Sequence, residues 1–161
     1  PTIYGRRDGD MFELFRAARW GVVPVPAVGR SSIIHADDVS ALLLALIPGD
    51  ADVSRRSFEP DDGKPGGWGH EELARAIGKA VDRTPLALRL SPRIMRWAAQ
   101  IDMRLRGAGA KLTLDRVGYM TYPDWVVSAD AAVPPGLWHS RIATPEGLKT
   151  TAQWYRENGW L

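Results

Sequence analysis

The stretch that decides the fold reads Arg30-Ser-Ser-Ile-Ile-His35-Ala-Asp37-Asp38-Val39 and continues as Ser40-Ala-Leu-Leu-Leu-Ala-Leu-Ile47. Its first part predicts a short strand, and its second part predicts a helix. We expect Asp37 or Asp38 to cap this helix, because a carboxylate accepts the free N–H groups of the first turn and suits its positive end. Apolar residues occur all around the helix, which predicts that it is buried. A strand that leads through an acidic turn into a buried helix indicates an α/β fold.

Length and composition predict one ordinary globular domain covering residues 1–161. The chain has 45% hydrophobic and 25% charged residues and no cysteine, so it offers neither a disulfide framework nor a thiolate nucleophile. The longest apolar run, Ala41 to Ile47, is too short to span a bilayer, and the N-terminus lacks the apolar region of a signal peptide. We therefore expect a cytoplasmic protein without a membrane partner.

The charge pattern gives little support to nucleic-acid binding. Several arginines follow predicted helix faces, namely Arg16, Arg19, Arg93, Arg96, Arg104 and Arg106. However, 19 acidic residues offset the 21 basic ones, and arginines on helix faces are usually solvated. We expect no nucleic-acid partner.

The residues on their own predict no catalytic group and no metal site. The three histidines, at positions 35, 70 and 139, lack the spacing of known metal-binding motifs, and no G-x-S-x-G nucleophile motif occurs. His35 beside Asp37 and Asp38 could form a metal or acid/base site, but a structural role for all three is the simpler interpretation. The glycine-rich segment Pro60–Gly69 does not match a phosphate-binding loop and is interpreted as a flexible connection. The seven tryptophans either pack loop-rich parts of the fold or line a ligand pocket.

Periodicity and end signals predict several further elements. Asp8 or Asp10 should cap a helix beginning near Met11, and the prolines of segment 22–26 confine that extended segment to an edge or a connection. Residues 71–81 should form an amphipathic helix, and residues 85–90 a strand with one buried face. Ser91-Pro92 should begin a helix whose inner face is formed by Ile94, Trp97, Ala98, Ile101 and Leu105. Thr113 should cap a short helix, and the inner face of the last helix should be formed by Leu148, Thr151, Ala152 and Tyr155.

Three segments, in order along the chain, resemble one protein family. Pro1-Thr-Ile-Tyr4-Gly5 is similar to a Pro-x-x-Val-Tyr-Gly segment, and Ile34-His35-Ala-Asp37-Asp38-Val39 to a Phe-Ile-His-Val-Asp-Asp-Val segment. Gly136-Leu-Trp138, followed by Glu146-Gly-Leu148, Thr151 and Trp154-Tyr155, resembles the carboxyl-terminal close of the same family, although Gly136-Leu137 reverses the usual order. The family is the extended short-chain dehydrogenases/reductases, the NAD(P)-dependent epimerases and dehydratases.

The resemblance implies the carboxyl-terminal part of an NAD(P)-binding, Rossmann-like fold, mostly helical with short strands. The glycine-rich cofactor fingerprint and the catalytic Tyr-x-x-x-Lys of the family are absent: the residues four positions after the tyrosines are Asp8, Pro123, Val126 and Gly159. In the family, both motifs precede the segments matched here. The resemblance therefore implies a substrate-binding portion that has no catalytic residue of its own and binds NAD or NADP weakly or not at all.

The resemblance also assigns roles to individual residues. It places Tyr4 and Gly5 near the nicotinamide, and Arg6, Arg7, Arg30 and Trp68 near the substrate. The partners it implies are a small-molecule substrate and the absent amino-terminal Rossmann half, and it allows a homodimer. The alternative is a stand-alone binding or interaction module derived from the same family without catalysis.

Overall fold

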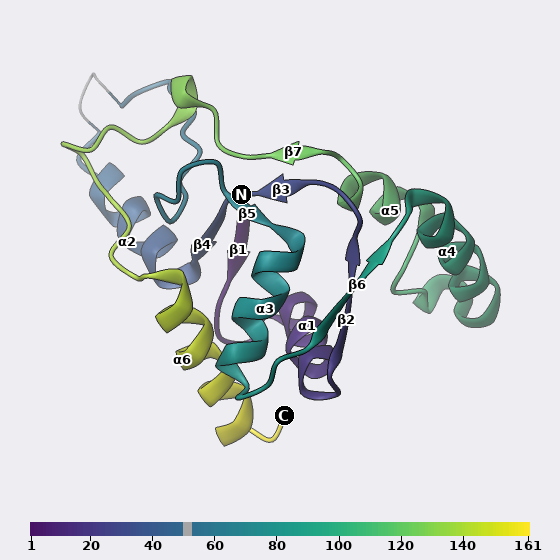
Figure 1. The fold of residues 1–161 in the computed structure, drawn as a ribbon. Coiled ribbons are helices and arrows are strands. Elements are labelled where there is room, and N and C mark those ends of the chain that lie inside the picture. Colours follow the sequence, from purple (N-terminus) through teal and green to yellow (C-terminus); the bar gives the residue numbers. More distant parts are fainter. Residues whose placement is uncertain (50–52) are drawn as a thin grey trace.

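The computed structural model describes residues 1–49 and 53–161 and shows an α/β arrangement, mostly helical with short strands (Figure 1). Residues 50–52 lie outside the described residues. The elements in chain order are β1 (Thr2–Tyr4), α1 (Gly9–Arg19), β2 (Val22–Pro26), β3 (Arg30–Ser31), β4 (Ile33–His35), α2 (Ala36–Leu46), β5 (Trp68–Gly69), α3 (His70–Ala80), β6 (Leu86–Leu90), α4 (Pro92–Arg106), η1 (Gly107–Gly109), α5 (Leu114–Met120), β7 (Asp124–Trp125), η2 (Ala129–Ala131) and α6 (Thr144–Glu157).

The strands of the described residues form three small sheets. β1 runs parallel to β4, with Thr2 opposite Ile33 and Tyr4 opposite His35. β2 runs parallel to β6, and β3 lies between β5 and β7. Within the described residues β2 has β6 as its one neighbour, which agrees with the edge position that its prolines predict.

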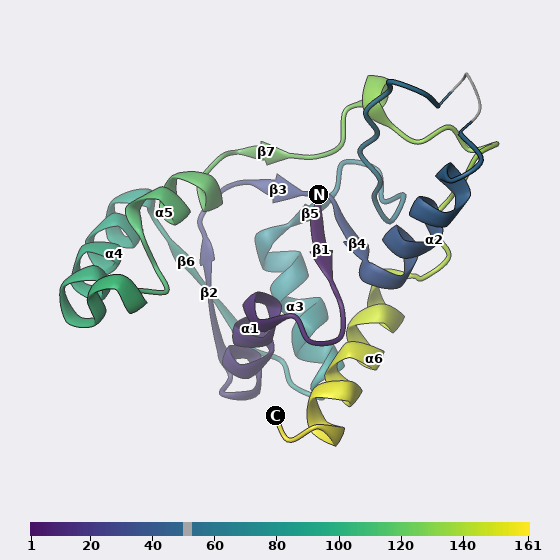
Figure 2. The same ribbon diagram turned by 180° about the vertical axis from the view of Figure 1, so that it is seen from behind.

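The main core lies where α1, α3 and α6 meet β1 and β2. In Figure 1, α3 is toward the viewer, and the view from behind in Figure 2 shows α1 on the other side. Phe15 of α1, Ile77 of α3 and Tyr155 of α6 are completely buried in this core. The predicted inner face of the last helix is confirmed, since Leu148, Thr151, Ala152 and Tyr155 are all buried.

Three helix starts follow their sequence signals. The Asp8 carboxylate accepts the N–H groups of Asp10 and Met11 at the start of α1. Ser91 caps α4 ahead of a proline in its first turn, and Thr113 caps α5. Short polar side chains at these positions satisfy N–H groups that the helix itself leaves free.

The predictions for α2 are wrong in two respects. The cap is His35, whose Nδ1 accepts the N–H of Asp37 at 3.1 Å, so neither aspartate caps the helix. The helix is also not buried all round, because Leu44 is 67% exposed and Leu43 and Ile47 are similarly open. α2 lies at the margin of the molecule, where the segment between η2 and α6 passes beside it (Figure 1). Trp138 of that segment packs in one cluster with Leu42 of α2, while Leu43 and Leu44 remain exposed.

The predicted inner face of α4 is wrong as well. Trp97 is 66% exposed and Leu105 80% exposed, while the buried residues are Met95 and Ala99, which pack against Val117 of α5. α4 carries apolar residues on two faces, so periodicity alone cannot select the buried one. β6 also lacks the predicted buried face, because within the described residues it pairs with β2 and no second layer covers Leu86 and Leu88.

In the part of the chain that the structure describes, no helix combines the length and the apolar character needed to cross a membrane.

Candidate functional site

Tyr4 is a core residue rather than a group facing an open site. Its side chain is 1% exposed, its hydroxyl donates to the Thr144 carbonyl at 3.3 Å, and its ring meets that of His35 edge-on. Burial raises the pKa of Tyr4 to about 12, and the nearby carboxylates of Asp62 and Asp38 also raise it. A tyrosine that acts as acid and base near neutral pH needs a lowered pKa, so Tyr4 does not suit that role.

The predicted substrate residues divide between opposite ends of the β1–β4 pair. Arg6 follows the end of β1 and forms an ion pair with Asp37 at 3.1 Å, in which both side chains are more than half exposed. Arg7 is exposed and has a left-handed backbone, with φ at 66°. Arg30 precedes β4 and forms a 3.0 Å ion pair with Asp124 of β7. The structure therefore does not bring the three arginines together.

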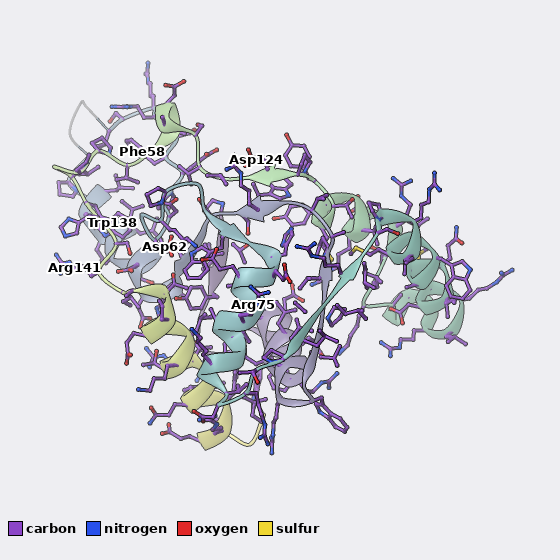
Figure 3. All side chains as sticks on the ribbon, in the orientation of Figure 1. Phe58, Asp62, Arg75, Asp124, Trp138 and Arg141 are labelled. Carbon is purple, nitrogen blue, oxygen red and sulfur yellow. The ribbon has the colours of Figure 1, made fainter. Side chains whose placement is uncertain are left out.

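Trp68 and the loop before it are held in place by hydrogen bonds. The indole N–H of Trp68 donates to Asp62 at 2.7 Å, and Ser32 donates its hydroxyl to Asp61 at 2.7 Å. The hydroxyl of Thr144 also donates to Asp62. Trp68 lies on the same side as Arg30, since Arg30 pairs with Gly69 between β3 and β5; their partners Asp62 and Asp124 are labelled in Figure 3. The flexible connection predicted for this segment is in fact a fixed loop.

The glycine-rich loop is not arranged as a cradle for the pyrophosphate of a dinucleotide. The glycine-rich loop packs against β3, since a Cβ on Gly67 would lie 2.9 Å from the Ser31 carbonyl oxygen. A pyrophosphate needs free backbone N–H groups. In this loop such groups are already used, since the Asp62 N–H donates to the Ile33 carbonyl and the Gly63 N–H donates to the Asp61 carboxylate.

His35, Asp37 and Asp38 have separate tasks in the structure. Asp38 is 3% exposed, and its carboxylate accepts the N–H groups of Arg141 and Ile142 and the hydroxyl of Ser140. These bonds tie α2 to the segment that leads into α6. Burial lowers the pKa of His35, and this effect outweighs the nearby carboxylates of Asp37 and Asp38, which raise it. The imidazole therefore stays neutral, and its Nδ1 can accept the hydrogen bond that caps α2. No group of three or more His, Asp and Glu side chains within the described residues could hold a metal ion.

An apolar cavity of about 150 Å³, which the sequence did not reveal, lies between α1, β2, α3 and the α5–β7 segment. Its lining includes Thr2, Met11, Val25, His70, Ala74 and Trp125. The alternation of Val23 and Val25 and the apolar face of α3 were visible in the sequence. They indicate core as readily as cavity, and the elements that meet here are distant in the sequence.

His70 is the titratable residue in the buried part of this wall. Burial lowers its pKa, so the imidazole is neutral near pH 7. Its Nε2 is buried and has no hydrogen-bond partner among the described residues. Unpaired buried polar atoms are rare in folded proteins, so this one calls for an explanation such as a bound water or ion or a functional role.

Comparison of sequences identifies no relative: no family model matches the chain, and no curated protein matches it. Comparison of structures does identify similar folds. The human epimerase family protein SDR39U1, solved with NADPH, has a TM-score of 0.65 and 15% identity over 94% of this chain. UDP-glucose 4-epimerase of Thermotoga maritima, solved with UDP-glucose, has a TM-score of 0.60 and 15% identity over 98% of this chain. GDP-mannoheptose C4 reductase of Campylobacter jejuni, with NADP bound, has a TM-score of 0.58 and 13% identity over 96% of this chain.

In each case the match uses less than half of the other protein: 46%, 44% and 47% of those chains, respectively. At these identities the likeness concerns the fold. The chain therefore has the α/β fold found in about half of the length of several epimerase and reductase structures.

Proposed function

We propose that this chain forms the substrate-binding part of an NAD(P)-dependent epimerase, dehydratase or reductase of the extended short-chain dehydrogenase/reductase family. One observation carries the proposal: nearly the whole chain superimposes on about half of the length of each of the proteins compared above. Two of those three were solved with NADP(H). The three sequence segments that resemble the family lie within this part. The parent enzyme would use NAD or NADP.

The chemistry of the parent enzyme needs groups that this chain lacks. Its family moves a hydride between nicotinamide and substrate with a tyrosine as acid/base and a lysine that lowers the pKa of that tyrosine. No tyrosine here is followed by a lysine at the required spacing. Burial raises the pKa of both Tyr4 and Tyr155. The chain alone is therefore proposed to be catalytically inactive, with the cofactor-binding half and the catalytic pair supplied by another segment.

The role left to this chain is to bind and orient the substrate. The apolar cavity begins at Thr2 of β1, the strand that the family resemblance places beside the nicotinamide. A substrate held there would present its reactive carbon toward the cofactor-binding half. In this proposal Arg6 and Arg30, which are both exposed, contribute only at the margins of the site.

The quickest test is to read the coding sequence upstream of the codon for Pro1. The proposal predicts an in-frame glycine-rich fingerprint followed by Tyr-x-x-x-Lys. An upstream sequence without these motifs would contradict it and would leave the stand-alone module as the better account.

One observation favours that second candidate, a stand-alone binding module. The core around Phe15, Ile77 and Tyr155 is fully buried by the chain's own residues. Against the stand-alone module, Ile3 of β1 and Leu43 and Leu44 of α2 are exposed apolar side chains. Sedimentation velocity separates the two candidates. A monomer that stays monodisperse at high concentration supports the module, and self-association that the missing half suppresses supports the enzyme part.

A further inference from the structure

Two walls of the apolar cavity come from the main core. Val23 and Val25 of β2 form one wall, and Ala74 and Ile77 of α3 form the facing one. All four side chains are buried, and they belong to the same core cluster. Positions set by a packed core are defined before any ligand arrives, as in most small-molecule sites.

The wall of the cavity carries no formal charge. None of the described residues that line it is Asp, Glu, Lys or Arg, and His70 is neutral because burial lowers its pKa. The amino-terminal end of α3 reaches the cavity at His70, but Glu71 and Glu72 in its first turn oppose the binding of an anion there. Phosphate groups in proteins are held by arginine, lysine or free helix N-termini, so this cavity is unsuited to a nucleoside diphosphate.

The size of the cavity limits what it can hold. A protein cavity of about 150 Å³ with an apolar lining is known to take up benzene. The volume here is also about 150 Å³, which is enough for about six carbon atoms in a ring or a branched chain. At the rim, Tyr119 and Trp125 lie with ring centroids 4.6 Å apart, and both are partly exposed. Aromatic rings at such a rim suit a ligand that passes from water into an apolar space.

We propose that this cavity binds a neutral, apolar portion of the substrate, such as a cyclic, prenyl or branched acyl group, and not a sugar nucleotide. The inference rests on the proposed function in calling the ligand a substrate, but the binding itself can be measured without cofactor or turnover. The lining residues with polar side-chain groups are few and uncharged, namely Thr2, Ser31 and His70, with Tyr119 and Trp125 at the rim. They suit a ligand with a single carbonyl or hydroxyl oxygen, the group on which a nicotinamide enzyme acts.

The experiment is an NMR titration of the ¹⁵N-labelled chain with cyclohexanone, a six-membered apolar ring that carries one oxygen, and separately with UDP-glucose. We expect cyclohexanone to shift the amide signals of Val25, Ala74 and Ile77 in a saturable way, with millimolar affinity. We expect UDP-glucose to leave those signals unchanged. Saturable shifts of the same signals by UDP-glucose, or no shifts with cyclohexanone, would overturn the inference.

A pair of variants shows whether the shifts report on the cavity. Ala74→Leu places a larger side chain in the cavity and should weaken cyclohexanone binding at least tenfold. Ala76→Leu makes the same change two positions along α3, at a half-buried residue outside the cavity wall, and should leave binding unchanged. Ala74→Val is the substitute if Ala74→Leu does not fold. Equal binding by the Ala74 and Ala76 variants would overturn the inference.

The two proposals can fail separately. Binding of UDP-glucose in the cavity would contradict the proposal of an apolar ligand but not the proposed substrate-binding role. Tight binding of NADPH by the chain alone would contradict the proposed function, whether or not cyclohexanone binds.

Discussion

Gly147 of α6 lies so close to Tyr4 of β1 that a Cβ on Gly147 would stand 2.3 Å from the tyrosine hydroxyl oxygen. The same Cβ would lie 3.1 Å from Cδ2 of His35. The last helix can therefore pack on the β1–β4 pair only because it presents a glycine there. This contact joins the first strand of the chain to its last helix.

Gly147→Ala should lower the free energy of unfolding by about 2–3 kcal/mol, because the added methyl group has no space and forces α6 away from Tyr4. Urea denaturation measures the change. Gly118→Ala in α5 is the matched control, since nothing lies within 4 Å of its Cβ position. Alanine is the better helix former, so the control should gain about 0.5–1 kcal/mol. A neutral Gly147→Ala would show that α6 does not pack on Tyr4 as described.

Asp38→Ala should destabilise the chain by about 2–3 kcal/mol, because it leaves the buried N–H groups of Arg141 and Ile142 without an acceptor. Asp37→Ala removes an exposed ion pair with Arg6 and should cost less than about 1 kcal/mol. Thermal and urea unfolding of the two variants can be compared directly. Equal losses would contradict the different roles of these neighbouring carboxylates.

The chain should lose stability as the pH falls from about 7 to about 5. Burial lowers the pKa of both His35 and His70 in the folded state. Below the unfolded pKa of about 6.5 the unfolded chain binds protons that the folded chain does not, so acid favours unfolding. His35→Asn keeps a side-chain acceptor for the Asp37 N–H and removes one of the two titrating imidazoles. The stability of this variant should therefore fall less steeply as the pH is lowered. An unchanged slope would show that His35 does not stay neutral in the fold.

Met95→Ala should cost about 2–4 kcal/mol, because Met95 is buried between α4 and α5. Trp97→Ala removes a much larger side chain but should change stability by no more than about 0.5 kcal/mol, because Trp97 is mostly exposed. Denaturant midpoints for the two variants test which face of α4 is the inner one. The reverse order of losses would restore the face predicted from the sequence.

Local signals predicted the parts of the fold that local chemistry determines. The caps at Asp8, Ser91 and Thr113 and the inner face of α6 are as predicted, because each depends on residues within a few positions of one another. The errors concern burial. Whether Leu44 of α2 or Trp97 of α4 is covered depends on which element lies opposite, and periodicity does not contain that information.

The candidate site was harder to predict than the fold. Arg6 and Arg30 are close to recognisable motifs, but the register of β1 with β4 places them at opposite ends of the pair. The cavity wall combines Thr2, Val25, Ala74 and Trp125, which come from four separate elements or their ends. Each of these residues alone resembles ordinary core or surface. Only the packing of α3 against β2, with α5 and β7 at the rim, shows that they enclose a space.

We propose that this chain supplies a substrate site and not a cofactor site, and calorimetric titration of the purified chain with NADPH and NADH tests this most directly. We expect no saturable binding at micromolar concentrations of either nucleotide, because the chain has no glycine-rich fingerprint and its glycine-rich loop packs against β3. Stoichiometric binding of NADPH or NADH with micromolar or tighter affinity would contradict it.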